Sequence, residues 1–437
     1  MKVSIFWHRR DLRLHDNAGL YHALRGEFPV VPIFIFDRNI LDELPKKDAR
    51  VEFIHHEILR LRQDLKNMGS DIRVYYGKPH EVWAQILNEF DVAAVYTNRD
   101  YEPYAKDRDK EVKQLCEKNN ISFQTFKDHV IFEDGEIEKN DGGPYTVFSP
   151  YARKWRSKLE SKMENGRSFY LKAYPCEKYK DNYHTFKADD VPTLESMCFE
   201  ETDIEIPSRE VPRSIIKSYK EIRNFPAADG TSRLGIHFRF GTISIREKAY
   251  RSQSLSDTYL NELIWRDFYS QILGAFPHVV SQSFREAYDH IPWRENDEEF
   301  KAWCEGRTGY PIVDAGMREL NTTGYMHNRV RMITASFLTK HLLMDWRKGE
   351  AYFAEKLLDF ELASNNGGWQ WAAGSGTDAA PYFRIFNPDS QQKKFDKDYR
   401  YIKKWVPEFG TDDYPEPLVD HKFARERCLE TYKESLK

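Results

Sequence analysis

The spacing of hydrophobic positions changes about a third of the way along the chain. In the first third, short apolar runs rich in Val, Ile, Phe and Tyr lack strict alternation, as is typical of strands buried on both faces. We expect strands at 3–7, 30–36, 72–76 and 92–96, separated by helical patterns at 17–25, 50–67, 80–90 and 105–118. This order predicts an α/β domain with a doubly wound parallel sheet over residues 1–133.

Beyond this domain the pattern becomes irregular and then helical. Turn signals and a weakly periodic, charged and Pro-containing stretch predict an interdomain linker over 134–215. An all-helical domain is expected over 216–437, with helices at 257–273, 297–305, 312–321, 326–344 and 352–360. The segment 359–371 is expected to be a loop that contacts a ligand, because it concentrates Asn, Gly and Trp.

Composition limits the class of protein. The chain has 437 residues, 40% hydrophobic and 31% charged, which predicts a globular protein of two domains. No apolar run is long enough to span a membrane. The five cysteines are widely spaced without a Cys-x-x-Cys pair, so we expect neither disulfides nor a metal site, and the N-terminus shows no secretory signal; a cytoplasmic protein is expected.

The net charge of the whole chain predicts no polyanionic partner, but one segment has the opposite charge. The chain carries −4 at pH 7, whereas residues 381–404 hold seven Lys or Arg and three Asp. This segment is either a solvated basic surface or a strip that contacts nucleic-acid phosphates.

One predicted helix carries an unusual face. Glu262, Trp265, Arg266 and Tyr269 fall at i, i+3, i+4 and i+7 and therefore lie on one side. An aromatic ring beside a carboxylate and a guanidinium suits a surface that stacks a flat ring and contacts its polar edge. The alternative is a Trp at the rim of the core.

Three further segments carry candidate chemistry. Residues 231–235 are hydroxylic and basic ahead of a helical stretch, so they form either an anion site or an ordinary helix cap. Asn328, Arg331 and Met332 lie on one side of a helix, and seven of the ten Trp lie between Trp265 and Trp405. No P-loop or dinucleotide fingerprint is present in a suitable context.

Taken together, these segments resemble the photolyase/cryptochrome flavoprotein family, and specifically class I cyclobutane pyrimidine dimer photolyases. The resemblance runs through most of the chain and is carried by residues 6–17, 98–103, 145–150, 231–234, 260–266 and 365–388. It implies an N-terminal α/β domain, a long linker and an all-helical domain that binds FAD.

The resemblance also assigns a cofactor site. It implies that residues 231–235 hold the flavin phosphates, that Arg331 and Asp359 form an ion pair beside the ring, and that Asn365 faces flavin N5. The implied FAD-binding residues are Tyr219, Thr231, Ser232, Arg233, Leu234, Gly235, Tyr259, Arg266, Arg331, Asp359, Phe360, Glu361 and Asn365. The chain departs from the family at Gly235, Tyr259, Tyr325 and Glu361.

The implied reaction is light-driven. Excited reduced FAD donates an electron to a flipped-out pyrimidine dimer in UV-damaged DNA, the cyclobutane ring splits, and the electron returns to the flavin. The resemblance makes Glu262, Trp265, Asn365 and Trp371 catalytic, with the two Trp as walls of the dimer site. The implied DNA-binding residues are Arg223, Glu262, Trp265, Arg266, Tyr269, Asn328, Arg329, Met332, Trp371 and Gln391.

Two accessory features follow from the same resemblance. Trp369, Trp346 and Trp293 correspond to a photoreduction chain that carries electrons to the flavin, with Trp369 next to the flavin, Trp346 intermediate and Trp293 at the surface. A second, antenna chromophore is left open between a deazaflavin, a folate and none. Asp100, Glu102 and Arg239 are similar to the deazaflavin-binding subgroup.

The main alternative is a cryptochrome, a blue-light photoreceptor that signals through protein partners. Asn365 and the retained Trp265 favour repair, and a (6-4) photoproduct enzyme is disfavoured because Met326 and His327 stand where a His pair is needed. We expect a monomeric enzyme whose partner is damaged DNA.

Overall fold

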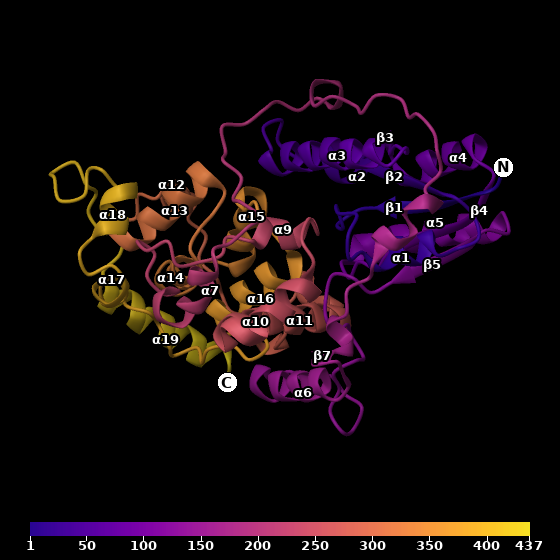
Figure 1. Cartoon of the computed structure of the whole chain (residues 1–437). Coiled ribbons are helices and arrows are strands. Elements are labelled where there is room, and N and C mark those ends of the chain that lie inside the picture. Colours follow the sequence, from indigo (N-terminus) through magenta and orange to yellow (C-terminus); the bar gives the residue numbers. More distant parts are fainter. The chain divides into compact units, whose positions relative to one another are not determined.

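The computed structural model describes residues 1–437 and divides them into two compact units. The sheet unit comprises Met1–Glu133, Arg156–Arg209 and Leu234–Arg251, and the helical unit comprises Asp134–Trp155, Glu210–Arg233 and Ser252–Lys437. The chain therefore passes between the units several times (Figure 1). The segment that we predicted as a linker, 134–215, is divided between them.

The sheet unit contains a five-stranded parallel sheet with the order β3-β2-β1-β4-β5. Its strands are β1 (Val3–His8), β2 (Val30–Asp37), β3 (Arg73–Gly77), β4 (Val92–Asn98) and β5 (Ser122–Phe126). The first four confirm the predicted strands and the predicted α/β class. β5 was missed because it is a short, partly exposed edge strand with few aliphatic residues.

Helices cover both faces of this sheet. The unit contains α1 (Ala18–Leu24), α2 (Arg38–Leu41), α3 (Ala49–Asn67), α4 (Pro79–Glu89), α5 (Pro103–Lys118) and α9 (Gly235–Arg239). In β1, Phe6 packs in one apolar cluster with α1 and α3, whereas Ile5 and Trp7 pack in a second cluster with α4 and α5. The sheet is therefore doubly wound.

The rest of the sheet unit consists of short elements and of helices that continue into the other unit. These are α6 (Phe148–Glu160), β6 (Met163–Glu164), β7 (Arg167–Ser168), α10 (Ile245–Leu255) and the 3-10 turns Phe169–Leu171, Cys176–Asn182 and Glu195–Met197.

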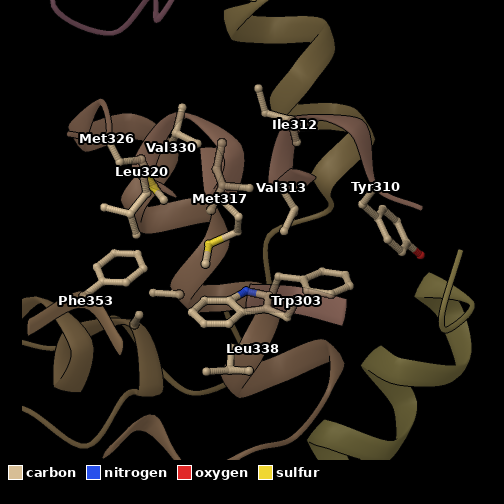
Figure 2. Close-up of a cluster of buried hydrophobic side chains, with 14 of the residues drawn as sticks. Trp303, Tyr310, Ile312, Val313, Met317, Leu320, Met326, Val330, Leu338 and Phe353 are labelled. Atoms are coloured by element: carbon tan, nitrogen blue, oxygen red, sulfur yellow. The ribbon is translucent and has the colours of Figure 1, made fainter. Parts of the chain in front are cut away.

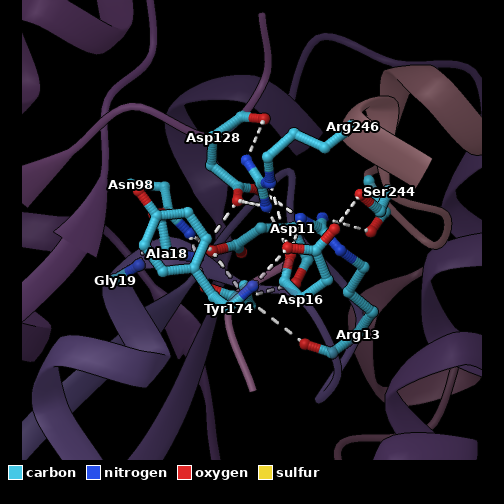
Figure 3. Close-up of polar contacts among 12 residues, drawn as sticks. Asp11, Arg13, Asp16, Ala18, Gly19, Asn98, Asp128, Tyr174, Ser244 and Arg246 are labelled. Atoms are coloured by element: carbon cyan, nitrogen blue, oxygen red, sulfur yellow. Dashed lines mark hydrogen bonds and ion pairs between the residues drawn. The ribbon is translucent and has the colours of Figure 1, made fainter. Parts of the chain in front are cut away.

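A buried ionic network fastens residues 234–251 to the carboxyl ends of the strands (Figure 3). The Arg246 guanidinium donates to Asp16 at 2.9 Å and to Asp128 at 2.8 Å, and Arg13 donates to Asp128 at 2.6 Å. Ser244 also donates to Asp16. Burial alone would raise the pKa of Asp128, but Arg13 and Arg246 hold it well below its usual range.

The helical unit is built around one apolar core (Figure 2). Trp303 lies at its centre, fully buried, among Val313, Met317, Leu338 and Phe353. The helices are α7 (Arg213–Lys217), α8 (Tyr219–Ile222), α11 (Asp257–Ala275), α12 (Asp297–Glu305), α13 (Pro311–Thr323), α14 (Asn328–Ser336), α15 (Trp346–Lys356), α16 (Leu362–Ala373), α17 (Pro388–Phe395), α18 (Arg400–Trp405) and α19 (His421–Ser435). A π-helix (Phe337–His341) and the 3-10 turns Pro277–Val280 and Glu286–His290 complete it. None of the helices combines the length and apolar character that crossing a bilayer needs.

Two of the local predictions in this unit were wrong. The helix expected at 352–360 begins earlier, at Trp346, and ends at Lys356. The loop expected over 359–371 is mostly helix α16. Of its two glycines, Gly367 is required by close packing, because a Cβ there would lie 2.3 Å from Cδ1 of Tyr269.

Replacing Arg246 tests the ionic network. Arg246→Ala leaves Asp16 and Asp128 buried with fewer partners, so we expect a loss of about 3–5 kcal/mol in the free energy of unfolding, measured by urea denaturation. Arg38→Ala is the control. Its ion pair with Asp42 is exposed, with 47% and 42% of the two side chains accessible, and we expect little or no change in the free energy of unfolding. Equal losses in the two variants would contradict the structural role of the network.

Candidate functional site

Helix α11 presents the polar and aromatic face that its spacing predicts. Glu262, Trp265, Arg266 and Tyr269 are each half-buried, while Phe268 and the aliphatic residues between them point into the core. The helix begins after Ser256, whose hydroxyl accepts a hydrogen bond from the backbone of the first turn. The structure therefore brings these four candidate residues together on one accessible face.

Ion pairs fix the charged members of this face. Arg266 donates to Glu361 at 2.9 Å, and Arg223, from the end of α8, pairs with Glu262. Glu361, which replaces the usual Asp of the family, thus still reaches Arg266. The two carboxylates hold both guanidinium groups beside Trp265.

The Trp265 ring is held by other aromatic rings. Phe148 stacks on it with ring centroids 3.6 Å apart and planes within 5°. Phe268 meets Trp265 edge-on at 5.6 Å. We did not single out Phe148 from the sequence, although it lies in the family-like segment 145–150.

Arg331 and Asp359 form the predicted ion pair. The guanidinium of Arg331 lies 3.0 and 3.1 Å from the two carboxylate oxygens and also donates to the Met326 carbonyl at 2.7 Å. Burial alone lowers the pKa of Arg331, but Asp359 raises it above its usual value. The Arg331 side chain is 24% accessible and the Asp359 side chain 19%, so both can still contact a ligand.

The hydroxylic loop before α9 is braced by two tyrosines. Thr231 shares a hydrogen bond of 3.0 Å with the Tyr325 hydroxyl, and the Tyr259 hydroxyl donates to Ser232 at 3.2 Å. Burial raises the pKa of Tyr259 to about 12, so this hydroxyl stays protonated. Both tyrosines replace frequent Trp of the family, and both use the hydroxyl that Trp lacks.

The other members of this predicted loop are placed differently. Arg233 has a left-handed backbone (φ 49°), and its guanidinium lies 4.9 Å over the Tyr325 ring. Leu234 and Gly235 open α9 and belong to the sheet unit. Tyr219 meets Tyr259 edge-on at 5.1 Å.

Asn365 has a partner that the sequence did not indicate. Its amide nitrogen donates to the backbone carbonyl of Glu350 at 3.1 Å and to the Glu350 carboxyl at 2.8 Å. Burial raises the pKa of Glu350, although the bond from Asn365 opposes the rise. Because both donor bonds point at Glu350, the amide oxygen is left to accept from elsewhere.

The candidate electron-transfer residues lie in or against the core of the helical unit. Trp369 on α16 is buried, edge-on to Phe353 at 5.0 Å. Trp346, the first residue of α15, is buried, and Trp293 packs against the same core. Phe360, a predicted cofactor residue, also packs against this core, and Trp371 is half-buried on α16 with Phe386 6.4 Å away.

The predicted DNA-binding residues include a group of cations. Arg329 donates to Asn224 at 2.8 Å, lies 4.5 Å over the Phe395 ring and contacts Met332. Burial and two neighbouring guanidinium groups, those of Arg223 and Arg384, lower the pKa of Arg329. Asn328 is exposed beside them, and Gln391 is half-buried on α17.

The antenna candidates form an ionic cluster in the sheet unit. Arg10 lies 3.0 Å from both Asp100 and Glu102, and Arg239 pairs with Glu102. Burial alone raises the pKa of Asp100, but Arg10 and other nearby cations lower it well below its usual range. The three candidates therefore lie together, at the carboxyl end of β4.

Comparison with protein families matches two parts of the chain. Residues 4–168 match the family described as DNA photolyase, and residues 259–411 match the FAD binding domain of DNA photolyase. The chain is 37% identical to the deoxyribodipyrimidine photo-lyase of Halobacterium salinarum, covering 98% of each protein. It is 35% identical to that of Escherichia coli, covering 100% of each.

Solved structures are similar over the same length. A class III photolyase from Agrobacterium tumefaciens has a TM-score of 0.85 at 32% identity, covering 100% of this chain and 98% of that one. An archaeal photolyase from Sulfolobus tokodaii, solved with two FAD molecules, has a TM-score of 0.82 at 35% identity, covering 99% and 100%.

The close approach of α15 and α16 depends on a glycine. A Cβ on Gly349 would lie 2.1 Å from Cη2 of Trp369. Gly349→Ala is therefore expected to displace the Trp369 ring and to lower the free energy of unfolding by about 1–3 kcal/mol. Urea denaturation measures the loss of stability, and near-ultraviolet circular dichroism measures the change in the environment of the Trp369 ring.

The matched control is a second helical glycine. Gly368 has nothing within 4 Å of the added carbon, so Gly368→Ala is expected to leave stability unchanged or to raise it by about 0.5–1 kcal/mol. An unchanged stability and spectrum in Gly349→Ala would contradict the packing described here.

Proposed function

Since this chain belongs to the DNA photolyase family, we propose that it is a deoxyribodipyrimidine photo-lyase that uses blue light and FAD to split cyclobutane pyrimidine dimers in DNA. The observation that carries the proposal is the convergence in one helical unit of the Arg331–Asp359 pair, the braced 231–233 loop and the aromatic face of α11. Relatives with this activity align over the full chain.

The donor set fits FAD. A flavin dinucleotide has two anionic phosphates and a flat ring with polar edges, so it needs hydroxyls, cations and mixed donors and acceptors. Thr231 and Ser232 supply hydroxyl groups and Arg233 supplies a cation for the phosphates. The Arg331–Asp359 pair supplies a hydrogen-bond donor beside an acceptor for the edge of the ring. The proposed contacts are those predicted from the sequence, Tyr219, Thr231, Ser232, Arg233, Leu234, Gly235, Tyr259, Arg266, Arg331, Asp359, Phe360, Glu361 and Asn365.

When bound, FAD supplies light absorption and a transferable electron, and the protein positions it. Asn365 offers an acceptor because Glu350 occupies its amide nitrogen. The amide oxygen therefore suits a ring nitrogen that carries a hydrogen, as N5 of the reduced ring does. Trp369, Trp346 and Trp293 are proposed to carry electrons from the surface.

On the DNA side, Trp265 and Trp371 are proposed as the walls that hold the extruded dimer. Glu262 and Asn328 supply polar contacts near them. Burial lowers the pKa of Arg329, and the neighbouring guanidinium groups of Arg223 and Arg384 lower it further. A group of three cations of this kind favours contact with DNA phosphates. Arg223, Arg266, Tyr269, Met332 and Gln391 complete the proposed DNA-facing set.

Finer assignments follow the resemblance. We propose the class I type, a cytoplasmic monomer, and an antenna chromophore near Asp100, Glu102 and Arg239. The ionic cluster of these residues, which gathers charged groups at the carboxyl edge of the sheet, supports the last proposal.

Trp265→Ala tests the proposed substrate site. Loss of one stacking wall is expected to weaken binding to an oligonucleotide with one thymine dimer by about 1–3 kcal/mol, measured by fluorescence anisotropy in darkness. Binding to undamaged DNA of the same sequence, which relies on phosphate contacts, is the internal control and should not change. An unchanged affinity for damaged DNA would reject the stacking role.

Trp293→Phe tests the electron path. We expect light-driven reduction of the oxidised enzyme, followed by absorption spectroscopy, to stop because phenylalanine is much harder to oxidise than tryptophan. Repair by chemically reduced enzyme should persist. Trp405→Phe, outside the proposed path, is the control, and photoreduction that survives in Trp293→Phe would show that the path is wrong.

A further inference from the structure

Phe148, the first residue of α6, covers one face of the Trp265 ring within the helical unit. The two ring centroids are 3.6 Å apart and the planes are within 5°, so the rings overlap face to face. Aromatic pairs left to themselves prefer offset or edge-to-face arrangements. The surrounding structure must therefore hold this one.

A third ring and two backbone ties hold the pair. Phe268 is fully buried and meets Phe148 edge-on at 5.7 Å and Trp265 edge-on at 5.6 Å. The backbone nitrogen of Phe148 donates to Asp378 at 3.2 Å. Two residues earlier, the Thr146 carbonyl accepts from the Thr377 hydroxyl at 2.6 Å. Phe148 is thus fixed from its ring and from its backbone.

The stack leaves part of Trp265 accessible. Phe148 is buried, with 7% of its surface accessible, whereas Trp265 is half-buried. One face of the indole lies against Phe148, one edge lies against Phe268, and the Tyr269 ring lies tilted by 33° at 5.4 Å. Because Phe148 covers the face that it stacks on, the accessible part of Trp265 lies away from Phe148.

We propose that Phe148 is a positioning residue for the substrate: it fixes the plane of Trp265, and an extruded pyrimidine dimer stacks on the part of the indole that stays accessible. An indole that is already held in place loses less rotamer freedom when the substrate binds. The proposal rests on the proposed function, because it takes Trp265 as a wall of the dimer site. The proposal assigns to the substrate site a residue, Phe148, that lies outside α11.

The test is a binding series with FAD-loaded protein in darkness. Phe148→Leu removes the flat ring but stays apolar, and we expect affinity for an oligonucleotide with one thymine dimer to fall about tenfold. Affinity for undamaged DNA and FAD content should not change. Phe148→Tyr keeps the ring and should restore most of the affinity.

A matched control removes a ring beside a different tryptophan. Phe300 stacks near Trp303 at 5.8 Å, and neither ring is among the proposed contacts with DNA, so Phe300→Leu should bind damaged DNA like the wild type. If Phe148→Leu does not fold, Phe148→Met replaces it, because methionine fills irregular space.

A double-mutant cycle separates positioning from general structure. In a Trp265→Ala background, Phe148→Leu should change the affinity for damaged DNA less than twofold, because its effect acts through Trp265. A full tenfold loss in that background, or no loss from Phe148→Leu alone, would overturn the proposal. Wild-type protein that does not prefer damaged DNA would contradict the proposed function as well, so the two failures can be told apart.

Discussion

The buried contact of Arg246 with Asp16 and Asp128 is the constraint on which the course of the chain depends. It attaches residues 234–251 to the sheet unit, and Arg13 and Ser244 complete it. Buried charges are costly unless paired, so any other placement of this segment would leave Asp16 and Asp128 buried with fewer partners. The hydroxylic loop at 231–233 ends directly at this anchored segment, and the tyrosines brace the loop itself.

Helix α16 has a comparable role in the helical unit. It carries Asn365, Trp369 and Trp371 within two turns, so that one element holds residues proposed for the cofactor site, the electron path and the substrate wall. Asn366 and Gln370 tie it to the Val279 carbonyl at 2.8 and 2.9 Å, and Gly367 lets it approach Tyr269 of α11. The spacing between the two helices that present Trp265 and Trp371 is therefore set by small residues and buried amides.

The hydrophobic pattern was sufficient to predict the fold class, because buried strands and amphipathic helices have strong periodic signals. It failed for β5, which is a polar edge strand, and for α16, where packing outweighs the low helix propensity of Asn and Gly. The face of α11 was predicted because its members are neighbours on one helix. Glu350 and Phe148 were missed because their partners, Asn365 and Trp265, are distant in sequence and meet them only in the folded chain.

The most direct measurement is repair of an oligonucleotide that contains one thymine cyclobutane dimer, by pre-reduced, FAD-loaded protein, in blue light and in darkness. We expect intact thymines to be recovered only in the light. If the protein holds reducible FAD and no thymines are recovered in blue light, the proposed photolyase function is contradicted.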